Sequence, residues 1–181
     1  MEMAIGVVVG IVVIVLIWYI VVMNGIKTLE LKVKEGESGI DVALTKRYDT
    51  LTKMLDVVKA YKEHEQSTLT KLVELRRGMT MSEKNAASRN MDDVTKEINI
   101  LAENYPELKS SNNFATLQNT ITDVEEHLQA ARRLYNSNVN AYNRKIVVFP
   151  NSIVASGMKA VEKPYFEAES TKRQDVKMDF S

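Results

Sequence analysis

The sequence predicts an all-α protein: an N-terminal transmembrane helix followed by an elongated antiparallel bundle of three long helices and a short C-terminal helix. Three observations predict it. Residues 3–23 contain no charged residue. Only 3 of the 181 residues are proline, so long stretches lack the residue that most strongly breaks helices. Along those stretches apolar residues recur three and four positions apart, and strand-like alternation is absent.

Residues 3–23 are the expected membrane anchor. At 1.5 Å per residue they form a helix of roughly 31 Å, about the thickness of the hydrocarbon core of a bilayer. A cleaved signal peptide is the alternative, but the start of the chain has no Lys or Arg, only Glu2, and no small-residue cleavage site follows the apolar run. Trp18 and Tyr19 lie near the end of the run, where aromatic rings favour the headgroup region. We therefore expect an uncleaved, single-pass anchor.

The orientation follows from the flanking charges. Lys27, Lys32 and Lys34 follow the anchor, whereas the short N-terminus offers only its α-amino group. Positive charge stays on the cytoplasmic side, so we expect the N-terminus outside the cell membrane and the C-terminal domain in the cytoplasm.

Gly6 and Gly10 form a G-x-x-x-G motif within the anchor. This spacing lets two membrane helices approach closely, so both glycines are candidates for transmembrane dimerisation and for a homo-oligomer. Glycine is common in membrane spans, which is the simpler explanation of the motif.

Three long helices are expected over residues 24–62, 67–104 and 113–148. Each would be roughly 54–58 Å long, and matched helices joined by short loops pack antiparallel. Their apolar stripes consist of Leu44, Tyr48, Leu51, Leu55, Val58 and Tyr61; Met91, Val94, Ile98, Leu101 and Tyr105; and Phe114, Leu117, Ile121, Val124, Leu128, Ala131, Tyr135, Asn138 and Tyr142.

The ends of these helices are predicted from capping residues and prolines. Ser67 or Thr68 would cap the second helix, which ends before Pro106, and Asn112 or Asn113 would cap the third, which ends before Pro150. Within the second helix Gly78 would allow a kink, and Gly25, Gly36 and Gly39 make the start of the first a candidate hinge. The short last helix is expected near residues 160–170. The predicted organisation is an anchor (1–23), a juxtamembrane helix (24–43), a bundle (44–170) and a tail (171–181).

Composition and motifs favour a protein without catalytic activity. Lys and Arg together number 24, as do Asp and Glu, so the chain has no net charge that would attract nucleic acid. It has no Cys and lacks the P-loop, G-x-G-x-x-G and G-x-S-x-G motifs. We expect no cofactor.

The two histidines do not predict a metal site. Di-iron bundles place Glu three residues before His, but Tyr61 precedes His64 and Val124 precedes His127 at that spacing. Both histidines are expected on solvated faces. The pairs Arg76-Arg77 and Arg144-Lys145 are likewise expected on solvated helix faces.

Many short segments, in a fixed order, are typical of one family. They are Val33–Glu35, Ser38, Ile40–Val42, Leu44, Lys46–Asp49, Tyr61, His64–Glu65, Tyr105–Lys109, Asn113–Phe114, Ala131–Arg133, Tyr135–Asn136, Tyr142–Asn143, Phe149–Asn151, Phe166–Ala168 and Val176. In these the chain resembles the LemA family, from the anchor to the last residues. The resemblance implies a membrane-tethered helical bundle from bacteria or archaea. It carries over no catalytic residue, because the family has no agreed activity, although its genes often lie beside those of membrane proteases or other envelope proteins.

The chain departs from the family pattern at two places. Relatives usually have an aromatic residue and an alanine where Gly36 and Glu37 stand, and a proline-containing motif in place of residues 51–54. Without that proline the first helix should be straighter.

Bulky polar residues lie within or beside the apolar stripes. They are Arg47, Tyr48, Asp49, Arg132, Arg133, Tyr135, Asn136, Tyr142 and Asn143. They would form either a polar groove that binds a peptide or anion, or an internal network that fixes the register of the helices.

Two functions fit these expectations. The first is a membrane-anchored scaffold or adaptor that presents its helices to a membrane-protein partner. The alternative is a membrane-tethered sensor or regulator that binds a peptide or small ligand in the polar groove.

Overall fold

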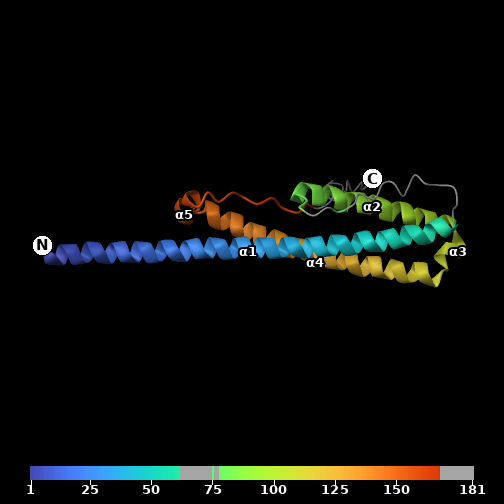
Figure 1. The fold of residues 1–181 in the computed structure, drawn as a ribbon, viewed down its shortest axis with the longest axis horizontal. Helices are drawn as coiled ribbons and strands as arrows, with labels where there is room; N and C mark the ends of the chain where they lie inside the picture. Colours follow the sequence, from blue (N-terminus) through green and yellow to red (C-terminus); the bar gives the residue numbers. More distant parts are fainter. Residues whose placement is uncertain (62–74, 76–77, 168–181) are drawn as a thin grey trace, which may run out of the picture. The chain divides into compact units, whose positions relative to one another are not determined.

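The computed structural model describes residues 1–61, 75 and 78–167 of the chain (Figure 1). Where the chain is described it is all helical and contains no strand, which confirms the predicted class. The helices are α1 (Glu2–Tyr61), α2 (Met81–Asn104), α3 (Pro106–Lys109), α4 (Asn112–Val147) and α5 (Asn151–Gly157). They form two compact units: Met1–Ser38 with Arg133–Pro164, and Gly39–Arg132 with Tyr165–Ser181.

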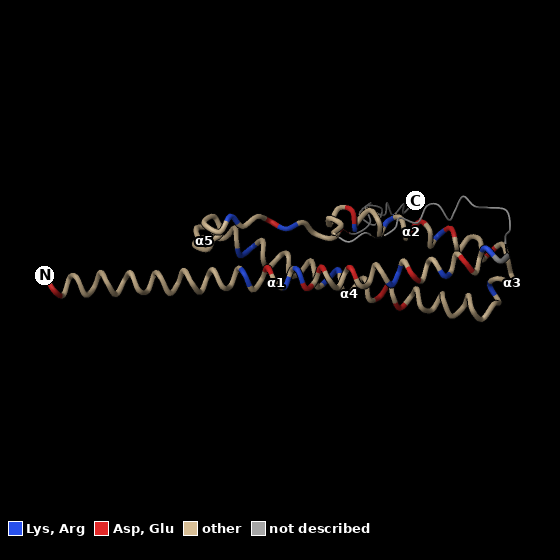
Figure 2. The backbone as a smooth tube through the Cα atoms, in the orientation of Figure 1, with Lys and Arg blue, Asp and Glu red and all other residues tan. Residues whose placement is uncertain are grey.

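Helix α1 is a single helix of 60 residues, so the predicted anchor and first bundle helix are continuous. It runs through Gly25, Gly36 and Gly39 without a break. In its first part the apolar side chains are exposed, and Figure 2 shows no charged residue there after Glu2. Among the described helices, α1 is the one that is long and apolar enough to cross a membrane.

The second helix begins later than predicted. Leu75 and residues 78–80 are not helical, Gly78 adopts a φ of 83°, and α2 starts at Met81, so a helix over 67–104 is wrong. The cause is a capping box: the Thr80 hydroxyl accepts a hydrogen bond from the Glu83 N–H, and the Glu83 carboxylate accepts one from the Thr80 N–H. Ser67 and Thr68, the predicted caps, lie outside the described residues.

Helices α1 and α2 run parallel in the second unit, not antiparallel as predicted (Figure 1). Asp41 pairs with Lys84, and further along both helices Arg47 pairs with Asp92. Helix α4 is antiparallel to α2 in this unit: Asn99 contacts Gln118, whereas Asp92, earlier in α2, and Glu125, later in α4, both contact Arg47.

The ends of α4 and α5 differ slightly from the prediction. Ser111 caps α4, since its hydroxyl accepts a hydrogen bond from the Phe114 N–H at 3.3 Å, and the helix ends at Val147. The short helix spans 151–157, whereas residues 160–167 are not helical. A helix over 160–170 would have placed Pro164 in its interior, where proline removes a backbone hydrogen bond.

Each unit has its own apolar core. The core of the second unit is built largely from the predicted stripes, whereas most core residues of the first unit lie outside them. The first contains Val22, Ile26, Val33, Tyr135, Val139, Tyr142, Ile146, Val154 and Ala155. The second contains Ile40, Leu44, Leu51, Met54, Leu55, Val58, Met91, Val94, Ile98, Leu108, Phe114, Ile121, Val124, Leu128 and Phe166.

Candidate functional site

The second unit contains a cavity of about 550 Å³ between α1, α2 and α4. This volume lies within the range of small-molecule sites. The residues that line it are Arg47, Asp92, Thr95, Lys96, Asn99, Ile121, Thr122, Glu125, Gln129 and Arg132. The cavity therefore joins Arg47 and Arg132, two of the polar residues singled out in the sequence.

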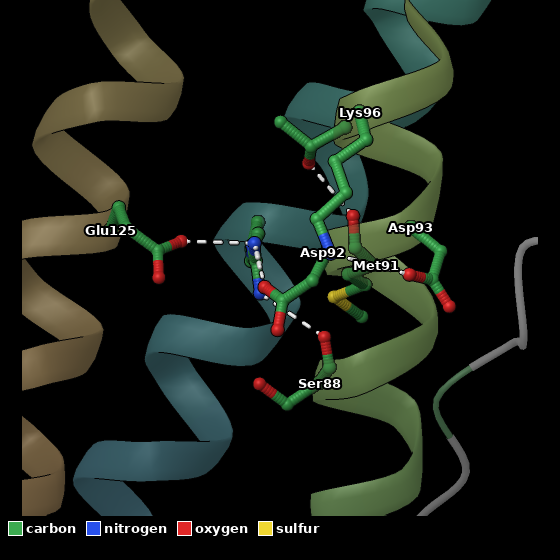
Figure 3. Close-up of polar contacts among 8 residues, drawn as sticks. Ser88, Met91, Asp92, Asp93, Lys96 and Glu125 are labelled. Atoms are coloured by element: carbon green, nitrogen blue, oxygen red, sulfur yellow. Dashed lines mark hydrogen bonds and ion pairs between the residues drawn. The ribbon is translucent and has the colours of Figure 1, made fainter. Parts of the chain in front are cut away.

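Arg47 is the central charged group of this cavity, with a side chain only 3% exposed. Its guanidinium donates to the Ser88 carbonyl at 3.3 Å and to Asp92 at 2.5 Å, and it lies 3.0 Å from Glu125 (Figure 3). Its Nε–H has no hydrogen-bond partner within the described structure. An unsatisfied buried donor costs about 1–3 kcal/mol, so an acceptor from a bound molecule or water would stabilise this arrangement.

The local sequence explains why these charges meet. Arg47 lies three residues after Leu44 and four before Leu51, which places it in the buried seam of α1. Asp92 follows the buried Met91 on α2, and Glu125 follows the buried Val124 on α4. Each carboxylate therefore lies at the edge of an apolar stripe. Asp92 reaches the buried guanidinium from α2, and Glu125 reaches it from α4.

The cavity carries both signs of charge. Two carboxylates face one guanidinium at Arg47, whereas Arg132 donates to the Glu167 carbonyl at 2.9 Å and lies 5.0 Å from the centre of the Phe166 ring. Such a site suits a ligand that has a hydrogen-bond acceptor and charged groups of both signs.

No reactive group stands out in the cavity. The hydroxyls of Thr95 and Thr122 donate to the carbonyls of Met91 and Gln118 in their own helices. In the part of the chain that the structure describes, no three His, Cys, Asp or Glu side chains are grouped so that they could hold a metal ion.

Tyr135, Tyr142 and Asn143 belong to the first unit, where they hold the segment after α5. Asn143 forms two hydrogen bonds with the backbone of Lys163, accepting from its N–H at 2.8 Å and donating to its carbonyl at 2.9 Å. The Tyr135 hydroxyl donates to the Pro164 carbonyl at 2.8 Å, and the Lys163 ammonium lies 5.8 Å from the centre of the Tyr142 ring. These residues thus form an internal network that holds Lys163 and Pro164 against α4.

Burial affects both tyrosines of this network. Desolvation, with a smaller contribution from the charge of Glu37, raises the pKa of Tyr135 to about 12. Desolvation and the charge of Glu30 also raise the pKa of Tyr142. Both hydroxyls are therefore protonated at neutral pH, as the hydrogen bond from Tyr135 requires.

The other predicted residues lie elsewhere. Asp49 and Arg133 are exposed, Tyr48 and Asn136 are half-buried, and none of the four lines the cavity. Gly6 and Gly10 lie in the exposed part of α1, with open space beside each. His127 is exposed, and Arg144 and Lys145 line a shallower hollow in the first unit. His64, Arg76 and Arg77 fall outside the described residues.

Sequence reasoning missed four charged residues that take part in ion pairs with a buried cation. Asp92 and Glu125 pair with Arg47, and Asp41 pairs at 2.6 Å with Lys84, whose side chain is buried. A signal was present: Lys84 stands seven residues before Met91, in the helical repeat of the second stripe, where a lysine must be paired if it is buried.

The fold and the site define a class: in its described residues the protein is helical, α1 is apolar enough to cross a membrane, and the later part of α1 lines a polar cavity together with α2 and α4. The chain belongs to the LemA family, whose family model matches residues 36–180. It is also similar to protein LemA of Metamycoplasma hominis, with 27% identity over 150 residues that cover 80% of this chain and 68% of the relative. These matches confirm the resemblance found in the sequence.

Proposed function

We propose that this LemA-family protein is a membrane-anchored adaptor without catalytic activity. The observation that carries the proposal is the contrast along α1. Val7, Ile14 and their neighbours expose apolar side chains that water solvates poorly, whereas Leu44 and Leu51 of the same helix are buried in a protein core. A bilayer would cover the first part, and the continuous helix would carry its charged continuation to the membrane surface.

The orientation in this proposal places the N-terminus outside and the other helices in the cytoplasm. Lys27, Lys32 and Lys34 lie close to the end of the anchor, where positive charge counts towards orientation, and they support a cytoplasmic location. A C-terminal tag should then resist protease in intact cells and become sensitive after permeabilisation. Cleavage in intact cells would reverse the orientation.

The adaptor role is tested by crosslinking in living cells. A photoreactive residue at the exposed positions Ile100 and Leu134 should capture specific membrane proteins, identified by mass spectrometry. A matched variant that carries an unrelated transmembrane helix in place of residues 3–23 should capture the same partners, because the other helices would make the contacts. Recovery of only background proteins from both variants would contradict the adaptor role.

A second candidate function, a ligand-dependent regulator, is favoured by the cavity at Arg47. An acceptor on a ligand would satisfy the buried Nε–H, and the surrounding charges suit a ligand of mixed charge, such as an amino acid or short peptide. Thermal shifts of the full-length chain in detergent should reveal such a ligand. Glu125→Gln should weaken the shift, whereas Glu126→Gln, which changes an exposed neighbour outside the cavity, should not. An equal response in both variants would place the ligand elsewhere.

A further inference from the structure

The connection between α4 and α5 exposes an unusual group of apolar side chains. Val147, Val148, Phe149 and Ile153 all lie within seven residues of one another and are all exposed, Phe149 at 76% and Ile153 at 61%. Single exposed apolar residues are common on soluble proteins, but four within one short segment favour a surface that meets something other than water. We call residues 147–153 the α4–α5 corner.

The position of this corner within the first unit indicates what covers it. A Cβ atom at Gly157, the last residue of α5, would lie 3.8 Å from the hydroxyl oxygen of Tyr19. Tyr19 stands near the end of the apolar run of α1, where aromatic residues mark the membrane interface. Helix α5 is therefore level with the last turns of the expected anchor.

The side chains of α5 are arranged to suit an interface. Val154 and Ala155 are buried in the core of the first unit, which orients the helix, and Ile153 is left exposed. The charged residues from 144 to 159 are Arg144, Lys145 and Lys159, with no acid among them. Apolar side chains flanked by cations alone are suited to anionic phospholipid headgroups.

We infer that the α4–α5 corner is a second membrane contact, which inserts Val147, Val148, Phe149 and Ile153 into the headgroup region of the leaflet from which α1 emerges. The inference rests on the anchor proposed above and adds a second attachment point to it. Two attachment points limit how far the part of the first unit outside the bilayer can tilt relative to the membrane. The occupant is the bilayer surface itself, and a second copy of the chain is an outcome that the test distinguishes.

Tryptophan fluorescence tests this contact in the full-length chain reconstituted into bilayers that contain anionic phosphatidylglycerol. The chain has a single tryptophan, Trp18, so its own emission reports on the anchor. Two variants carry Trp18→Phe with either Phe149→Trp or Ile153→Trp, and a control carries Trp18→Phe with Ile100→Trp, which replaces an exposed residue of α2 in the second unit. Lipids with brominated acyl chains quench a tryptophan that touches the bilayer.

The expected result is strong quenching of Trp18 and of the tryptophan at position 149 or 153, with little quenching at position 100. Quenching of Trp18 together with an unquenched corner would overturn the inference and leave the anchor intact. A blue-shifted but unquenched corner would also overturn it, because a second protein surface and not lipid would then cover the residues. Absence of quenching at Trp18 itself would overturn the anchor proposal and the inference with it.

Discussion

Gly36 of α1 lies against the backbone of Tyr135 in α4. A Cβ atom at Gly36 would stand 3.0 Å from the Tyr135 Cα and 3.3 Å from its Cβ, which is tighter than most Cβ contacts in proteins. The absence of a side chain therefore lets the two helices of the first unit approach. This is one of the two places where the chain departs from the family pattern, and the packing of Gly36 leaves no room for the aromatic residue that relatives usually have.

Gly36→Ala should destabilise the protein. Alanine gains about 1 kcal/mol of helix propensity, but a methyl group forced against backbone costs about 1–3 kcal/mol, and the backbone of Tyr135 cannot rotate away as a side chain can. Gly25→Ala is the matched control, because its new methyl group would meet only the flexible end of Lys145 at 3.7 Å. Thermal unfolding in one detergent should show a lower midpoint for Gly36→Ala and an equal or higher midpoint for Gly25→Ala. Equal gains in both would show that the helices separate easily.

Arg47, Asp92 and Glu125 form a cluster of ion pairs, and replacing the cation or a carboxylate should change the free energy of unfolding by different amounts. Asp92→Ala removes a partner from a guanidinium that is 3% exposed, and leaving such a charge partly unpaired should cost about 2–3 kcal/mol. Arg47→Met removes the buried charge itself and leaves two carboxylates that water reaches, so it should cost about 1 kcal/mol or less. The measurement is the free energy of unfolding in denaturant.

Asp93→Ala is the control for this pair of variants. Asp93 is 73% exposed and makes a surface ion pair with Lys96 at 3.6 Å, a kind of contact that contributes about 0–1 kcal/mol. Its loss should leave the free energy of unfolding nearly unchanged. If Asp92→Ala behaved like Asp93→Ala, the cluster at Arg47 would not contribute to stability.

The Asn143 side chain should control whether the segment after α5 stays in place. Asn143→Ala removes both hydrogen bonds to the backbone of Lys163 and leaves two backbone groups to find other partners, a loss of about 1–3 kcal/mol. Hydrogen exchange of residues 158–164 should become faster in this variant, and Asn119→Ala, at an exposed position of α4, should leave it unchanged. Unchanged exchange in Asn143→Ala would mean that Tyr135 and Lys163 hold the segment without it.

The sequence predicted those parts of the fold that depend on local spacing. The stripe from Phe114 to Tyr142 placed α4 within one residue, because amphipathic periodicity and helix geometry share one repeat. The direction of α2 relative to α1 could not be predicted in this way, because the spacing of apolar residues within one helix does not determine how two helices are oriented. The start of α2 was within reach, because Thr80 and Glu83 carry the spacing of a capping box.

Only some of the residues that line the cavity could be predicted from the sequence. Arg47 stood out because it interrupts an apolar stripe, but Asp92 and Glu125 look like ordinary solvated acids until the packing of the helices brings them to the guanidinium. Contacts between helices depend on axial register, which periodicity within one helix does not determine.

Alkaline pH should weaken the first unit through Tyr135. Its pKa is about 12 in the folded chain and 10.0 in the exposed reference state, so the unfolded chain loses this proton first. Stability is therefore unaffected by this group below about pH 10 and falls as the pH rises from there towards 12. Tyr135→Phe should remove this part of the fall, although it also loses the hydrogen bond to Pro164 and starts from a lower stability at neutral pH. The difference in tyrosinate absorbance between the native chain and Tyr135→Phe should show a midpoint well above 10, and a midpoint near 10 would mean that water reaches the hydroxyl.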